Sequence, residues 1–421
     1  QGYSKFIVIT KNSINLAKQT EERVIDFFDE DENKMQIINV KSEYEGFAKC
    51  EFQKINVFIL KKHTRDFEKL QDIIKKHPSI RNDLGLIIDD ESDEASVNHK
   101  TRVEKDILRA EKILYKAICQ CVTDLRDILP RANFLIVTAT PFVHYLSDNV
   151  LFRPHSVVLL KPHNQYFGGK QLFFSNDSKN VAIRENFVSE DEFSKISEFS
   201  GQQNDLYREF PKIAEALMAF YIGGIIRHIQ LNEKYLKHFS MLIHIDTHRA
   251  EHNKQEALIT NLIASFLEGI KKDDLELMSL INAVYANLKA SQSVELQFPS
   301  LIDVMKRLPG ALEEQSKIKI LNSDNKIGAE LYKGAIKNSV PFSIFIGALA
   351  VERGITFKNL ISFVFGRARK TIAADSSLQQ LRIFGARDPD DLNVTRLYAT
   401  EKMVDNWREL CKIEEIIRAN I

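Results

Sequence analysis

The chain contains little cysteine, carries no net charge and has no long apolar run, and each of these shortages excludes a class of protein. Four cysteines occur in 421 residues without the spacing of metal ligands, which predicts reduced thiols and a cytoplasmic location. No apolar run is long enough to cross a bilayer, so no membrane partner is expected. Basic and acidic residues number 58 each, which argues against a sequence-specific DNA-binding module but allows a local groove for a nucleic-acid backbone.

The rest of the composition is that of a large globular protein. Hydrophobic residues make up 44% of the chain and charged residues 28%, and 421 residues are enough for two or three domains with full cores. Short apolar runs rich in β-branched residues alternate with longer amphipathic stretches, which is typical of α/β proteins whose parallel sheets are flanked by helices. The alternation predicts a first lobe over 1–170, a largely helical connector over 171–235, and a second lobe with a helical insertion over 236–421.

The expected elements follow this division. Strands are expected at 5–10, 57–61, 84–89, 133–138 and 156–160 in the first part, and at 240–245, 317–321, 342–347, 360–365 and 394–399 in the second. Helices are expected at 13–28, 66–76, 104–129, 205–231, 249–269, 274–290, 326–338 and 401–420.

The strongest chemical signal is the sequence LGLIIDDESDE at 84–94. An apolar strand that ends in paired carboxylates is how phosphoryl-transfer ATPases hold Mg²⁺ and orient the attacking water. Asp90 is predicted to bind magnesium, directly or through water, because this hard cation needs oxygen ligands at the carboxyl end of a strand. Glu91 is predicted to polarise the water. Taken alone, an acidic loop after a strand is an equally good interpretation.

Two further segments follow at intervals along the chain. In FLIVTATPF at 134–142, a strand runs into the small hydroxyl residues Thr138 and Thr140 and then into a proline that blocks a helix. Hydroxyl groups at this point are suited to relay hydrogen bonds between a nucleotide and a neighbouring lobe. In QQLRIFGAR at 379–387, Arg382 and Arg387 are predicted to reach a γ-phosphate, because a guanidinium stays charged and grips phosphate oxygens. A solvated basic helix face is the alternative for the two arginines.

The order of these segments resembles the motifs of superfamily-two helicases and translocases. The details are similar to one branch, the Z1 domain family, which is often labelled endonuclease. Its pattern of IDDExDxAS, TATPF, YFG, RGxT and QxxRxFGxR resembles the segments at 88–96, 138–142, 166–168, 353–356 and 379–387. The wide spacing of Arg382 and Arg387 fits this family, whereas Leu381 departs from the usual glycine of the last motif.

The resemblance implies two tandem RecA-like lobes with ATP and Mg²⁺ in the cleft between them and a nucleic acid, expected to be DNA, over both lobes. It implies an ATP-driven translocase, the motor of a restriction or phage-defence system, often beside a separate nuclease subunit. Nucleotide contacts are expected from Thr138, Thr140, Arg353, Gly354 and Gln379, and nucleic-acid contacts from Thr10, Asn12, Lys61, His63 and Thr356. For the charged segment at 61–65, a solvated loop is an equal alternative.

The phosphate-binding pattern G-x-x-x-x-G-K-[ST] does not occur in the sequence. The chain enters a buried-strand pattern at 5–10 almost at once, and a domain rarely begins with its central strand. We therefore expect the first lobe to be truncated, with its phosphate loop just before Gly2. The 421 residues alone are expected to fold but to bind ATP poorly and to be inactive.

Two rival functions remain open at this point. The first is a metal-dependent nuclease, although no Asp…Glu-x-Lys set stands out from the charged background. The second is a motor remnant that has lost hydrolysis and serves as a scaffold.

Overall fold

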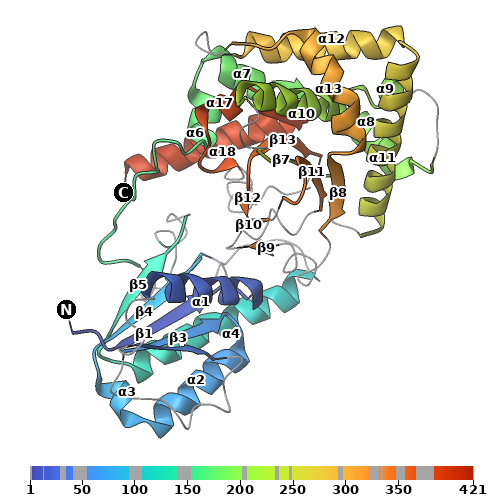
Figure 1. Ribbon diagram of the computed structural model, residues 1–421. Coiled ribbons are helices and arrows are strands. Elements are labelled where there is room, and N and C mark those ends of the chain that lie inside the picture. Colours follow the sequence, from blue (N-terminus) through green and yellow to red (C-terminus); the bar gives the residue numbers. More distant parts are fainter. Residues whose placement is uncertain are drawn as a thin grey trace. The chain divides into compact units, whose positions relative to one another are not determined.

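A computed structural model describes residues 2–12, 14–28, 35–40, 55–93, 107–139, 144, 153–201, 206–232, 237–245, 249–292, 297–321, 331–332, 335–336, 338–347, 356–366 and 384–420. The chain forms two compact units, Gln1–Leu159 and Leu160–Ile421, each built on its own parallel sheet (Figure 1). The expected α/β class, with two tandem lobes of parallel strands flanked by helices, is confirmed. Among the described residues, no helix combines the length and the apolar character needed to cross a bilayer.

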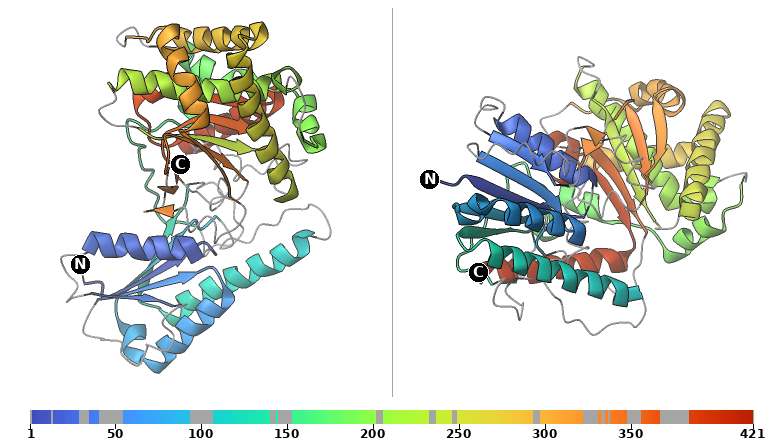
Figure 2. Two further views of the ribbon diagram at one scale, coloured as in Figure 1. Left: turned by 45° about the vertical axis from the view of Figure 1, so that its right-hand side comes forward. Right: turned by 90° about the horizontal axis from the view of Figure 1, so that it is seen from below.

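The first unit contains a five-stranded sheet in the order β2-β3-β1-β4-β5, and all its pairs are parallel. Its strands are β1 (Lys5–Thr10), β2 (Met35–Asn39), β3 (Ile55–Lys61), β4 (Gly85–Asp90) and β5 (Ala132–Val137). Its helices are α1 (Ile14–Phe28), α2 (Thr64–Lys76), α3 (Pro78–Asn82) and α4 (Ile107–Ile128). Helix α1 covers one face of the sheet, and α2 and α4 cover the other (Figure 2).

In β1 and β3, burial on both faces of the sheet explains why the sequence is a nearly continuous apolar run. Ile7 and Ile9 point to the face that packs on α2 and α4, whereas Val57 and Ile59 point to α1. Parallel pairing places the carboxyl ends of β1, β3, β4 and β5 at one edge of the sheet, where the chain leaves each strand.

The second unit contains a six-stranded parallel sheet in the order β6-β14-β13-β7-β11-β8. Its strands are β6 (Asn186–Phe187), β7 (Phe239–His244), β8 (Ser316–Ile320), β11 (Phe342–Ile346), β13 (Leu360–Phe365) and β14 (Arg396–Ala399). A small mixed sheet contains β9 (Leu331–Tyr332), β10 (Ala335–Ile336) and β12 (Thr356–Phe357). The helices are α6 (Gly169–Phe174), α7 (Ser178–Arg184), α8 (Glu190–Glu198), α9 (Leu206–Glu209), α10 (Pro211–Gln230), α11 (Arg249–Lys271), α12 (Leu275–Ala290), α13 (Leu301–Glu313), α17 (Pro389–Leu392) and α18 (Glu401–Ala419).

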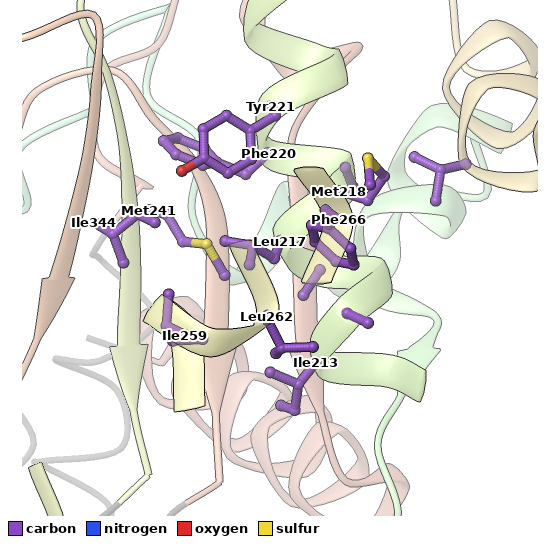
Figure 3. Close-up of a cluster of buried hydrophobic side chains, with 14 of the residues drawn as sticks. Ile213, Leu217, Met218, Phe220, Tyr221, Met241, Ile259, Leu262, Phe266 and Ile344 are labelled. Atoms are coloured by element: carbon purple, nitrogen blue, oxygen red, sulfur yellow. The ribbon is translucent and has the colours of Figure 1, made fainter. Parts of the chain in front are cut away.

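Helix α10 is the centre of the second unit's core. Its side chains Leu217 and Phe220 pack with Met241 of β7 and with Leu262 and Phe266 of α11 (Figure 3). A helix that is apolar on nearly every side must be buried on nearly every side, and the exposure of its residues confirms this. The segment that was expected to connect two lobes therefore contributes the central helix of the second unit.

Two expected elements are wrong. Residues 156–160 form no strand, and Val158 and Leu160 are exposed; none of the strands in the described ranges pairs with this apolar run. The helix expected at 326–338 is replaced, in its described part, by β9 and β10, which pair with each other. The strand β2 and the helix α13 were not predicted.

Two glycines of the second unit offer a test of its packing. A Cβ atom added to Gly224 of α10 would lie 2.5 Å from Cε1 of the buried Phe342, whereas one added to Gly310 of α13 would meet nothing within 4 Å. We expect Gly224→Ala to lower the free energy of unfolding by about 1–3 kcal/mol through overpacking. Gly310→Ala should raise it by about 0.5–1 kcal/mol, since alanine loses less entropy in a helix. Urea unfolding of both variants is the measurement, and equal effects would contradict the close packing of α10.

Candidate functional site

The acidic loop, defined as Asp90 to Asp93, begins with the last residue of β4 at the carboxyl edge of the first sheet. Asp90 is the last residue of the strand and pairs in register with Val137, the last residue of β5. Its Oδ1 accepts a hydrogen bond from the Glu91 amide at 3.0 Å. Glu91 itself has a positive φ of 47°, a left-handed conformation that costs a non-glycine residue about 1–2 kcal/mol. The loop therefore needs contacts that hold it in place.

Lys62 supplies such contacts from the residue after β3. Its ammonium group lies 3.1 Å from Oδ1 of Asp89 and donates to the carbonyl oxygens of Asp90 at 2.8 Å and of Glu91 at 2.5 Å. The side chains of Lys62 and Asp89 are 1% and 0% exposed, so removing one partner leaves a buried charge at a cost of about 3–5 kcal/mol. Lys11, which follows β1, has its Nζ 3.7 Å from Oε2 of Glu91.

The segment after β5 holds the other side of the acidic loop. Thr138 Oγ1 donates to Oδ1 of Asp93 at 2.7 Å. The buried Ser92 Oγ lies 2.7 Å from Nε2 of His144, and the Ser92 amide donates to the Val137 carbonyl at 3.2 Å. The structure thus brings the acidic segment and the Thr-Ala-Thr segment together through the Thr138–Asp93 and Ser92–Val137 hydrogen bonds.

The sequence did not identify Lys62, Lys11, Ser92 or His144 as site residues. The signal for Lys62 was its position directly after a strand whose carboxyl end lies at the same edge. Several basic residues lie in that segment, and the strand order decides which of them reaches the acidic loop. This order cannot be predicted from the sequence of one strand.

Four expected nucleic-acid contacts lie at or near this edge, with different exposure. Thr10 is buried and donates to the Leu60 carbonyl at 3.4 Å. Lys61 is also buried, with its Nζ 3.8 Å from Oδ2 of Asp66, and these contacts favour a structural role for both side chains. Asn12 is exposed, and His63 caps α2 by accepting from the Arg65 amide at 3.3 Å. The fifth, Thr356, is the first residue of β12 in the second unit.

In the second unit, the segment before α6 pairs with the segment that contains Arg387. The Phe167 amide donates to the Gly385 carbonyl at 2.9 Å, and the Arg387 amide donates to the Gln165 carbonyl at 2.8 Å. The isolated bridge between Tyr166 and Ala386 is antiparallel. Two sequence motifs far apart in the chain, YFG at 166–168 and the end of QQLRIFGAR, are therefore neighbours.

Arg387 is only 6% exposed, and its guanidinium carbon lies 6.0 Å from the ring centroid of Phe384. Burial lowers the pKa of Arg387 to about 10, and the opposing effect of Asp391 is smaller. The side chain therefore still carries its charge at neutral pH. The other expected site residues lie outside the described part of the chain: Thr140, Arg353, Gly354, Gln379 and Arg382.

The donor set at the acidic loop fits magnesium better than a transition metal. Within the described residues, no group of three or more His, Cys, Asp or Glu side chains could hold a metal ion. Magnesium sites need no such cage, because one or two carboxylates, waters and substrate phosphates complete the coordination. Asp90, at the end of a central strand and only partly buried, is placed to contribute such a carboxylate.

Comparison with known protein families places part of the chain beside one of them. Residues 212–421 match the family model of the Z1 domain, so this part of the chain is similar to that family. The match lies within the second unit and covers the positions of Arg353, Gly354, Gln379, Arg382 and Arg387, but the acidic loop lies outside it. No curated protein matches the chain.

Proposed function

We propose that this protein is the ATP-hydrolysing motor of a helicase-like nucleic-acid translocase that serves a restriction or phage-defence system. The observation that carries the proposal is the acidic loop. Asp90 and Glu91 stand at the carboxyl end of a central parallel strand, and Lys62 and Thr138 hold their loop from both sides. Ligands of open α/β sheets bind at this edge, outside the carboxyl ends of the strands.

In this proposal the two carboxylates have different tasks. Asp90 would hold Mg²⁺, which would supply charge neutralisation at the phosphates of ATP. Glu91 orients the attacking water and accepts its proton, and the nearby Lys11 holds the carboxylate in place. Thr138 and Asp93 link the loop to the end of β5, so that it keeps one geometry through the reaction.

The remaining proposed roles follow the motif order. Nucleotide and phosphate contacts are assigned to Thr140, Arg353, Gly354, Gln379, Arg382 and Arg387. Nucleic-acid contacts at the first sheet are assigned to Asn12 and His63, because Thr10 and Lys61 are buried and these two are accessible. In the second unit, the nucleic-acid contact is assigned to Thr356. The similarity of residues 212–421 to the Z1 domain supports the assignments in the second unit.

The proposal is tested by ATP hydrolysis in the full-length protein. We expect hydrolysis that requires Mg²⁺ and is stimulated by DNA, and we expect Asp90→Asn to raise the Mg²⁺ concentration at half-maximal rate. Loss of an outer-shell partner alone costs roughly tenfold or more in metal affinity, and a direct ligand should cost at least as much. Asp72→Asn, the same change on the exposed side of α2, is the control and should leave the Mg²⁺ dependence unchanged.

Three outcomes separate the proposal from its rivals. Stimulation of hydrolysis by DNA or RNA supports the motor and identifies its polymer. Metal-dependent cleavage of DNA without ATP, together with no ATP hydrolysis, would show that the protein is a nuclease and not a motor. ATP binding without turnover on any polymer would show that the protein is a scaffold that has lost hydrolysis.

A further inference from the structure

We infer that Lys62 is a positioning residue that sets the geometry of the acidic loop for water attack and links this loop to the β3–α2 turn. The inference rests on the proposed function for its consequence in turnover. Its structural content, that one ammonium group determines the conformation at Asp90 and Glu91, stands on the contacts alone.

The ammonium group of Lys62 donates two hydrogen bonds to backbone carbonyls and forms one buried ion pair. Asp89 balances its charge at 3.1 Å, and the carbonyl oxygens of Asp90 and Glu91 lie at 2.8 Å and 2.5 Å. The two carbonyls belong to the peptide groups on either side of the Glu91 α-carbon, where the chain turns from extended strand to a left-handed conformation. A charged donor on consecutive carbonyls therefore holds the turn on which both functional carboxylates depend.

The backbone of Lys62 is held in place as well as its ammonium group. Its amide donates to the Thr10 carbonyl at 2.8 Å, which ties it to the end of β1. Because β1 lies between β3 and β4 in the sheet, the side chain reaches past the end of β1 to the acidic loop. The next residue, His63, caps α2 and is one of the two accessible residues assigned to nucleic acid. A displacement of the β3–α2 turn by a bound strand would thus move Lys62 and, with it, the carbonyls of Asp90 and Glu91.

A second buried lysine in the same sheet provides the matched control. Lys5, at the start of β1, is 3% exposed and pairs with Asp83 at the same distance of 3.1 Å. It lies at the opposite edge of the sheet, away from the acidic loop. Lys5→Met therefore removes a buried, paired ammonium group from the same unit without touching the loop.

The test compares Lys62→Met, the charge-balanced double variant Lys62→Met with Asp89→Asn, and Lys5→Met. The double variant guards against unfolding, because it leaves no uncompensated carboxylate in the core. Hydrogen–deuterium exchange at the amides of Glu91 and Ser92, followed by NMR without nucleotide, measures the loop directly. We expect exchange there to be at least about tenfold faster in both Lys62 variants and unchanged in Lys5→Met.

Kinetics in the full-length protein provide the second readout. We expect the double variant to lower kcat by roughly tenfold to 100-fold, the range for losing a supporting partner, with little change in the KM for ATP. We also expect DNA to stimulate it less than the wild type. Exchange at Glu91 and Ser92 that matches the wild type in a folded double variant overturns the inference. So does exchange that rises equally across the whole sheet, since that indicates a general structural role. If the wild type does not hydrolyse ATP, the proposed function fails, while the exchange experiment still decides whether Lys62 positions the loop.

Discussion

Glu91→Gln is expected to reduce kcat by roughly 100-fold or more, the contribution of a positioned general base, and to leave nucleotide affinity nearly unchanged. The amide keeps the size and shape of the carboxylate but cannot take a proton from water. The backbone conformation should persist, because Lys62 and Asp90 hold it through the Glu91 carbonyl and amide groups. The loss therefore falls on the chemical step.

Steady-state hydrolysis and nucleotide titration of the full-length protein measure the two quantities separately. Glu68→Gln makes the same chemical change on the exposed side of α2 and should behave as the wild type. Near-normal turnover by Glu91→Gln would remove Glu91 from the catalytic machinery and leave the acidic loop as a structural turn.

Arg387→Met is expected to lower kcat by roughly 100-fold to 1000-fold while changing ATP affinity much less, since the guanidinium is proposed to stabilise charge on the transferring phosphate. Methionine fills much of the space of this buried side chain. Asp391, the acidic residue nearby, still has Arg227 at 3.0 Å and Lys237 at 2.6 Å. We therefore expect the free energy of unfolding to change by less than about 2 kcal/mol.

The burial of Arg387 makes its control important. Arg184 is a second buried arginine of the same unit, and it donates to the carbonyl oxygens of Leu172 and Ser175. Arg184→Met should lower stability without a specific effect on kcat. If Arg387→Met behaves in the same way, or reduces affinity and not turnover, Arg387 is a packing residue and the phosphate contact belongs elsewhere.

Local pattern was a good guide wherever a segment is buried on both faces. The strands expected at 5–10, 84–89 and 360–365 are confirmed within a residue. Short continuous apolar runs rich in β-branched residues are typical of buried strands in a parallel sheet, so the prediction was secure. A helix was expected at 205–231 as part of a connector, but the place of α10 in the core of the second unit was not expected. The run at 156–160 has the composition of a strand but is not one, and no strand in the described part of the chain pairs with it.

In the candidate site too, some residues were predicted from the sequence and others were identified only in the structure. The sequence located Asp90, Glu91 and Thr138 at the ends of two strands, and parallel pairing was enough to bring those ends together. It assigned Lys61 to nucleic acid and passed over Lys62. In the structure, Lys61 pairs with Asp66, and the neighbouring lysine turns to the acidic loop.

By itself, the sequence determined the α/β class, most of the strands and the position of an acidic turn after β4, because these depend on residue type and on spacing within one segment. Only the tertiary structure decided the strand order β2-β3-β1-β4-β5, which places Lys62 beside that turn, and the pairing of 165–167 with 385–387. Both depend on contacts between segments far apart in the chain. The hydrophobic pattern of a strand says which faces are buried, but it does not say which strand lies next to it.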